Sequence, residues 1–170
     1  GGGTWGTTLA ALLDKKRYDV TIWQRGSAKS KQLSTTRIHP NLKDLKISDS
    51  ISFTSDLSQL DFNHLTILAV PSHAFPDILS KVDIKNGKYL IASKGFEINS
   101  GLLQSELLEN NFNISSNNIA VISGPNHAEE IIAGMASATV IASTNKTYAK
   151  ELQSLFSSSR FRVYTSDDII

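Results

Sequence analysis

The sequence of 170 residues contains no cysteine, which excludes disulfide bonds and thiolate ligands for a metal. No apolar run approaches the roughly 20 residues that a membrane-spanning helix requires, and no signal peptide is visible. The formal net charge is only +1 at pH 7, so the composition favours neither nucleic acid nor an anionic membrane surface as a partner. Clusters of histidines and carboxylates at the spacing of metal ligands are also lacking, so we expect no metal site. These absences favour a cytoplasmic globular protein.

What the sequence does contain is an alternation of short apolar runs and amphipathic stretches. With 40% hydrophobic residues, it is long and apolar enough to form one globular domain with a substantial core. The alternation predicts an α/β fold of the Rossmann type, a doubly wound and mainly parallel sheet flanked by helices. The expected strands are residues 20–23, 51–54, 65–70, 89–92 and 119–122.

The stretch from residue 26 to residue 50 is polar and shows no helical period. Its cations, which are spread irregularly along it, are Lys29, Lys31, Arg37, Lys43 and Lys46. We therefore expect a solvated loop that wanders before the sheet resumes.

The chain opens with Gly1-Gly2-Gly3-Thr4-Trp5-Gly6, which fits the Gly-x-Gly-x-x-Gly pattern of dinucleotide sites. In this pattern Gly1 permits a tight turn, Gly3 lets the backbone approach a pyrophosphate, and Gly6 lets the next helix pack closely on the sheet. Apolar residues then recur at helical spacing up to Lys16, so the glycines open a helix whose free N–H groups can bind an anion. Such a fold also needs a buried strand leading into Gly1, and we expect this strand to be missing from the sequence.

The strand at residues 20–23 ends in Gln24-Arg25. A carboxylate at this point commonly binds the ribose hydroxyls of NAD, and none is present here. An arginine can instead pair with the 2′-phosphate of NADP, so Arg25 favours NADP or a site that accepts both cofactors. The alternative is an ordinary exposed arginine at the end of a strand.

Polar clusters follow three of the expected strands, at residues 71–73, 93–95 and 123–127. Because the carboxyl ends of parallel strands meet at one edge of a sheet, we expect these clusters to form a ligand site with the glycine turn. Lys94 is the strongest candidate, since its ammonium group can bind a phosphate or, if desolvated, donate a proton. A lysine that only extends from the sheet edge into solvent is the alternative. His73 and His127 are either walls of a pocket or, as we favour, ordinary loop histidines.

These residues resemble the bacterial-type NAD(P)-dependent glycerol-3-phosphate dehydrogenases, whose start typically reads Gly-Ala-Gly-Ser-Trp-Gly-Thr-Ala-Leu-Ala. The similarity covers residues 1–10 and continues in order and spacing through residues 70–75, 93–97, 123–130 and 156–168. The last block is specific, because nothing in a general dinucleotide-binding fold requires Arg160-Phe161-Arg162-Val163-Tyr164.

The resemblance implies an oxidoreductase that interconverts dihydroxyacetone phosphate and sn-glycerol 3-phosphate, a reaction that feeds glycerophospholipid synthesis. The glycine pattern assigns binding of the cofactor, NADP or NAD, to Gly1, Gly3 and Gly6, and the resemblance adds Thr4, Trp5, Arg25, Lys94 and Ala128, position by position. The resemblance implies that the substrate is bound by Lys94, Gly124 and Asn126. Asn126 and His127 depart from the family, which usually has Ser or Thr at the first position and Phe at the second.

In the family the general acid is a lysine of a C-terminal helical domain, at a position beyond Ile170. The resemblance therefore implies that residues 1–170 are an NAD(P)-binding domain, closed by a strand at residues 161–165, with no catalytic residue and no turnover of its own. A homodimer through the C-terminal domain is a further expectation. Two alternatives stay open, namely another dehydrogenase of the 6-phosphogluconate or ketopantoate type and a non-catalytic nucleotide-sensing module.

Overall fold

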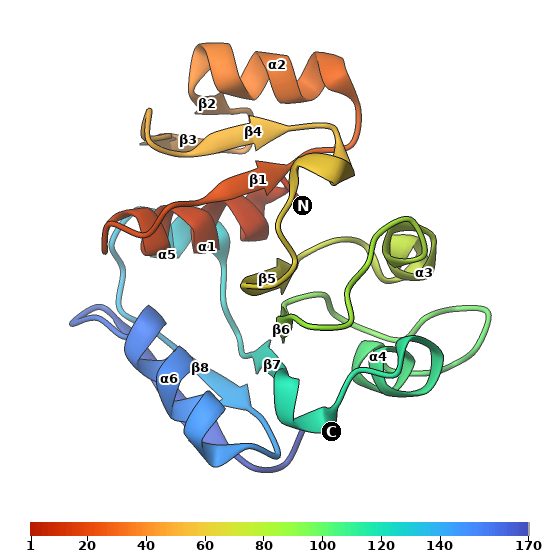
Figure 1. The fold of residues 1–170 in the computed structure, drawn as a ribbon. Coiled ribbons are helices and arrows are strands. Elements are labelled where there is room, and N and C mark those ends of the chain that lie inside the picture. The colour runs from red at the N-terminus through yellow and green to blue at the C-terminus, as the bar shows by residue number, and fades with distance from the viewer. Residues whose placement is uncertain (170) are drawn as a thin grey trace.

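The computed structural model describes residues 1–169, in which helices and strands alternate along the chain (Figure 1). The helices are α1 (Thr4–Asp14), α2 (Ser27–Thr36), α3 (Phe75–Leu79), α4 (Gln104–Phe112), α5 (Ala128–Ile132) and α6 (Lys146–Phe156). The strands are β1 (Thr21–Trp23), β2 (Ile38–His39), β3 (Leu42–Lys46), β4 (Ser52–Thr54), β5 (Leu65–Leu68), β6 (Lys88–Ile91), β7 (Ile119–Ser123), β8 (Ser137–Ala142) and β9 (Phe161–Ser166). Short 3-10 helices lie at Leu57–Gln59, Ser72–Ala74 and Ser116–Asn118.

The central sheet has five strands in the order β5-β6-β7-β8-β9. Its first three strands are parallel, β8 is antiparallel to β7, and β9 is parallel to β8. β1 and β4 form a separate parallel pair, and β2 and β3 form a small antiparallel one. The mainly parallel α/β fold predicted from the sequence is therefore confirmed.

Helices cover both faces of the central sheet, with α1, α5 and α6 on one face and α3 and α4 on the other (Figure 1). Neighbouring residues of a strand point to opposite faces, which explains this arrangement. Leu90 packs in a cluster with Leu9 of α1, whereas Ile91 packs in a second cluster with Phe75 of α3. None of the helices within residues 1–169 has the length and apolarity to cross a bilayer.

The prediction of a solvated loop at residues 26–50 is wrong, because this segment folds into α2, β2 and β3. Its apolar residues are few, yet Leu33, Leu42 and Ile47 are each only 1% exposed. Leu33 and Ile47 pack against Ile22 of β1 and Ala10 of α1 in a third small core. These few buried residues anchor the segment, but they are too widely spaced to produce a periodic signal in the sequence.

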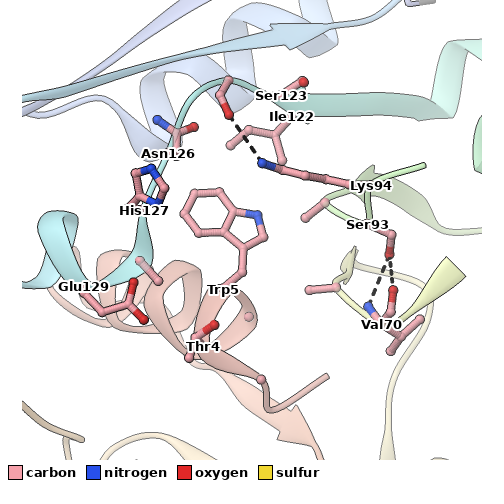
Figure 2. A pocket seen from close by; sticks show the side chains of 16 residues that line it. Thr4, Trp5, Val70, Ser93, Lys94, Ile122, Ser123, Asn126, His127 and Glu129 are labelled. Atoms are coloured by element: carbon pink, nitrogen blue, oxygen red, sulfur yellow. Dashed lines mark hydrogen bonds between the residues drawn. The ribbon is translucent and has the colours of Figure 1, made fainter. Parts of the chain in front are cut away.

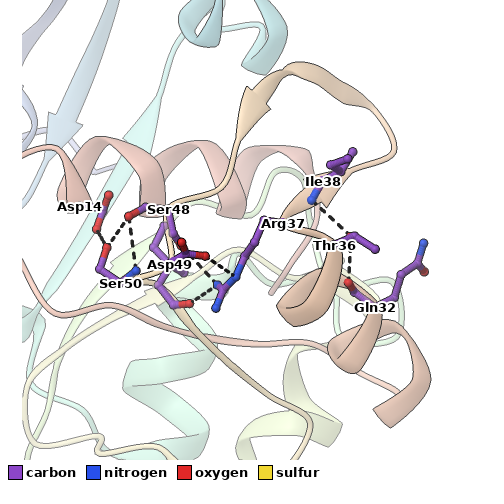
Figure 3. A network of polar contacts seen from close by, with 9 residues as sticks. Asp14, Gln32, Thr36, Arg37, Ile38, Ser48, Asp49 and Ser50 are labelled. Carbon is purple, nitrogen blue, oxygen red and sulfur yellow. Dashed lines mark hydrogen bonds and ion pairs between the residues drawn. The ribbon is translucent and has the colours of Figure 1, made fainter.

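Arg37, expected from the sequence to be a solvated cation of this loop, instead forms contacts that close the segment (Figure 3). It adopts a left-handed backbone conformation with φ 56° at the end of α2. Its Nη1 donates to the carbonyl oxygens of Ser48 at 3.2 Å and Ile51 at 2.6 Å, and its Nε lies 3.3 Å from the carboxylate of Asp49. The side chain thus ties the end of α2 to the chain that leads into β4.

Candidate functional site

The glycine turn is packed too closely to accept side chains at two of its positions. A Cβ on Gly1 would overlap the carbonyl oxygen of Ala69, and a Cβ on Gly6 would overlap the carbonyl oxygen of Gly1. Gly3 differs, because a Cβ there would meet nothing within 4 Å. Gly3 is the exposed residue that precedes α1, whose first N–H groups are free to bind a ligand. Gly1 and Gly6 therefore serve close packing, and Gly3 leaves open the space in front of the helix.

A cavity of about 390 Å³ lies beside this turn, at the carboxyl ends of β5, β6 and β7 (Figure 2). Side chains from these strand ends, from α1 and from the start of α5 point into it, with the indole ring of Trp5 in their midst. The residues named from the sequence that line it are Gly3, Thr4, Trp5, Gly6, Lys94, Gly124, Asn126, His127 and Ala128. Segments far apart in the sequence thus meet at one place, as the argument from parallel strand ends requires.

Lys94 extends from the end of β6, where its side chain is exposed. Its Nζ lies 3.5 Å from the carbonyl oxygen of Gly124, a long hydrogen bond that leaves other donor protons of the ammonium group available. The preceding residue, Ser93, holds this strand end in place. Its hydroxyl lies 2.9 Å from the carbonyl oxygen of Leu68 and 2.6 Å from that of Val70, and it accepts the N–H of Val70 at 3.2 Å. These hydrogen bonds tie the chain just before Lys94 to the end of β5.

Asn126 is fixed by the backbone around it. Its Nδ2 donates to the carbonyl oxygen of Ala138 at 2.7 Å, and its N–H donates to that of Gly124 at 2.9 Å. The amide oxygen then faces Gly124, where a Cβ would lie only 2.9 Å from it and 3.1 Å from the hydroxyl oxygen of Thr139. A side chain at position 124 would therefore crowd the amide of Asn126, and the amide oxygen of Asn126 remains as an acceptor at the cavity.

A second cavity, of about 260 Å³, lies on the other side of the glycine turn. It is lined by Gly1 and Arg25, which are absent from the first cavity, and also by His73 and Lys29. The two cavities share Gly3, together with Ala69 and Val70. A long ligand with a central anionic group can therefore extend from one cavity to the other across the turn.

Three residues near this site were not found by sequence reasoning, because their places depend on how α2 and α5 fold over the turn. Glu129 lines the first cavity and Lys29 the second. His39 is only 3% exposed, and its Nδ1 accepts the N–H of Asn41 at 3.2 Å. Burial lowers the pKa of His39, contact with the backbone of Gly2 raises it, and the Lys29 ammonium lowers it again. Burial is the largest of these effects, so the pKa of His39 lies below its ordinary value.

The side chains around the two cavities can be compared with the ligand sets that bind metal ions. Within residues 1–169, no three or more histidine or acidic side chains gather in a way that could hold a metal ion. The donors at the two cavities include backbone N–H groups, an ammonium group in each cavity and the guanidinium group of Arg25, which suit an anionic organic ligand.

Comparison with known proteins adds independent information. Residues 1–149 match the family described as NAD-dependent glycerol-3-phosphate dehydrogenase N-terminus. A glycerol-3-phosphate dehydrogenase (NAD(P)+) of Halothermothrix orenii is 34% identical, with 100% of this chain and 50% of the relative covered. The enzyme of that name from Pelodictyon phaeoclathratiforme is 36% identical, with 100% and 53% covered. The crystal structure of glycerol-3-phosphate dehydrogenase from Coxiella burnetii superimposes with a TM-score of 0.83 at 27% identity, covering 99% of this chain and 53% of that one. The chain spans about half the length of the curated relatives it matches.

Proposed function

Because the chain belongs to the family of N-terminal domains of NAD-dependent glycerol-3-phosphate dehydrogenases, we propose that it binds the cofactor, NADP or NAD, of an enzyme that interconverts dihydroxyacetone phosphate and sn-glycerol 3-phosphate. The observation that carries this proposal is the meeting of the glycine turn, Lys94, Gly124 and Asn126 around one cavity. The reaction would supply glycerol phosphate to glycerophospholipid synthesis.

The two cavities fit the two halves of a dinucleotide. We place the adenosine half in the cavity lined by Gly1 and Arg25, and the pyrophosphate at Gly3, in front of the N–H groups that begin α1. The nicotinamide half then lies in the larger cavity, against Trp5 and Ala128. Thr4 lines the same cavity at the first turn of α1, where its hydroxyl can reach the phosphate or the ribose next to it.

The bound cofactor supplies the hydride in this reaction, and the protein residues position and polarise the ketone. Lys94 lines the cavity with its ammonium group, which can bind the substrate phosphate or stabilise the negative charge that develops on the carbonyl oxygen. Gly124 and Asn126 form the wall next to it, and the amide oxygen of Asn126 can accept a hydrogen bond from a substrate hydroxyl. We assign delivery of the proton to a lysine that lies outside the described residues, beyond Ile170.

A third cavity, of about 360 Å³, separates β1 from β5 and reaches Gly1 and Gly6. Within the described residues, β1 is paired only with β4 and β5 only with β6, so each has one edge with free N–H and C=O groups. A parallel strand between them would pair with both edges. We propose that such a strand leads into Gly1 in the full-length protein and joins the two sheets into one.

The outer face of β8 and β9 is a second open surface. Val140 and Tyr164 lie opposite each other there and are 39% and 54% exposed. A cavity of about 440 Å³ is lined by Val140 and by Lys94. We propose that a C-terminal helical domain covers this face, brings the general-acid lysine next to Lys94, and forms a homodimer. A cytoplasmic location is part of the same proposal.

The test is an assay of the complete gene product, in which oxidation of NADH and of NADPH is followed with dihydroxyacetone phosphate and without it. We expect oxidation that depends on the substrate, and none from residues 1–170 alone. Binding of nucleotide without such turnover would overturn the substrate and point to another dehydrogenase or to a sensor. Substrate-dependent turnover by residues 1–170 alone would overturn the assignment of the general acid.

A further inference from the structure

Lys29 shares the smaller cavity with Arg25, although it lies one helical turn further along the chain. Gly26, with φ 90°, turns the chain after Arg25, so that α2 starts over the cavity and its first turn carries Lys29. Both side chains are exposed, and neither forms a hydrogen bond or an ion pair with any residue in the part of the chain that the structure describes. The cavity is therefore bordered by two cations whose charges are not neutralised by the protein.

The remaining lining of this cavity offers no negative charge. Its residues are glycines, apolar side chains, Gln24 and His73 besides the two cations, and no carboxylate is among them. The Nε2 of Gln24 donates to the carbonyl oxygen of Arg25 at 3.0 Å, so this amide is already bound to the strand end. A ribose with free hydroxyls gains little from such a lining, because the carboxylate that usually accepts from these hydroxyls is absent. A phosphate on the ribose gains two charge-assisted contacts.

The position of Lys29 is unfavourable for the helix itself. The first turn of α2 contains no acidic residue, and the residue that precedes the helix is a glycine without a capping side chain. A cation in the first turn is repelled by the positive end of the helix dipole. Lys29 lines the same cavity as Gly1, Gly2 and Gly3, so its side chain lies on the side of α2 that faces the glycine turn. A lysine at this position does not stabilise α2. It would, however, attract an anion bound in the cavity.

We propose that Lys29 is a second phosphate-binding residue that acts together with Arg25 to make the site select NADPH over NADH. The inference rests on the proposed function for the presence of a dinucleotide, and it adds the cofactor preference and the residue that sets it. Arg25 offers a planar fork at the strand end, and Lys29 offers a compact charge from the helix above, so the 2′-phosphate is held from two elements.

The experiment is a calorimetric titration of the full-length protein with NADPH and NADH, and with adenosine 2′,5′-bisphosphate and AMP as probes that lack nicotinamide. The test variant is Lys29→Gln. The matched control is Lys31→Gln, because Lys31 is an exposed lysine of the same helix that does not line the cavity.

We expect Lys29→Gln to weaken NADPH and the bisphosphate about five- to tenfold and NADH and AMP less than about twofold. Arg25→Gln should act in the same direction, and the double variant should bind both dinucleotides about equally. Lys31→Gln should change none of these affinities. The preference of the unmodified protein for NADPH should shrink as salt is raised, because the contacts are exposed.

Equal losses for NADPH and NADH in Lys29→Gln, or the same effect in Lys31→Gln, would overturn the role of Lys29. A protein that prefers NADPH through Lys29 but does not reduce dihydroxyacetone phosphate would retain this inference and lose the proposed substrate. A protein that reduces dihydroxyacetone phosphate with NADH and NADPH equally well would lose only this inference. A protein that binds neither dinucleotide would lose both.

Discussion

The ammonium nitrogen of Lys94 lies 3.5 Å from the carbonyl oxygen of Gly124, so the ends of β6 and β7 meet at the cavity that Trp5 lines. A single cation is thereby placed between the proposed nicotinamide position and the proposed substrate wall. An ammonium group in this place can act in the transition state more strongly than in the ground state, because the substrate carbonyl becomes more negative as the hydride arrives.

Replacing Lys94 with methionine should remove this charge and keep the length of the side chain. We expect kcat/KM for dihydroxyacetone phosphate to fall about 10²- to 10³-fold in the full-length enzyme, while the Kd of NADPH changes much less. Steady-state kinetics and calorimetry measure the two quantities. Lys85→Met is the control, because Lys85 is also exposed but lies outside the cavities described above. Unchanged kinetics in Lys94→Met would remove this lysine from the mechanism.

The glycines of the turn should separate into two classes when they are replaced by alanine. Gly6→Ala should destabilise the fold by about 1–3 kcal/mol, because the new methyl group overlaps the carbonyl oxygen of Gly1. Gly3→Ala should leave stability nearly unchanged, because the methyl group meets no protein atom within 4 Å. Its methyl group would instead stand where we place the pyrophosphate, so NADPH binding should weaken about tenfold or more.

Chemical denaturation and calorimetric titration of both variants check this pair of expectations. The glycine pattern already predicts different roles for the two positions, and the space around each glycine agrees with that difference. If Gly3→Ala bound NADPH as tightly as the unmodified protein, the pyrophosphate would not pass in front of Gly3.

The central strands could be predicted from the sequence for a simple physical reason. β5, β6 and β7 are covered on both faces, so they appear as continuous apolar runs with polar residues where each ends. β8 has no such signal, because Thr139 is buried while Val140 is 39% exposed. Neither this strand nor its antiparallel direction can therefore be predicted from the sequence pattern.

The same reasoning explains which site residues could be found. Gly3, Trp5 and Lys94 stand in local patterns, at a glycine turn or directly after an apolar strand, so the sequence points to them. Lys29 and Glu129 reach the cavities only through the folding of α2 and α5. Since α2 buries only Ser30 and Leu33, its sequence carries too little periodicity to predict the helix and therefore the direction of Lys29.

Arg37 should prove to be a stabilising residue of this segment. Replacing it with methionine removes two hydrogen bonds to carbonyl oxygens that lie next to the partly buried guanidinium. We expect the free energy of unfolding to fall by about 2 kcal/mol. Asp49→Asn is the control, because the Asp49 side chain is 90% exposed and its ion pair with Arg37 should contribute less than about 1 kcal/mol. Urea denaturation measures both, and equal losses would show that the ion pair carries the effect.

Tyr89 should make the protein lose stability in alkaline solution. Its side chain is fully buried and donates to the carbonyl oxygen of Ile84, and burial raises the pKa of Tyr89 from 10.0 to about 12. Between these two values the unfolded chain loses the proton while the folded chain keeps it, so folding becomes less favourable as the pH rises. The contribution of Tyr89 should therefore be complete below pH 10 and be lost as the pH approaches about 12.

Urea denaturation at pH 9 and pH 11 measures this loss, which we expect to be about 1–3 kcal/mol. Tyr89→Phe should be less stable than the unmodified protein at pH 9, because it lacks the hydrogen bond to Ile84, but should show a smaller loss between the two pH values. Burial also raises the pKa of Tyr148, so Tyr89→Phe should keep part of the pH dependence. Tyr18→Phe is the control, because Tyr18 is 51% exposed and should not change the slope. The same slope in Tyr89→Phe as in the unmodified protein would show that another group is responsible.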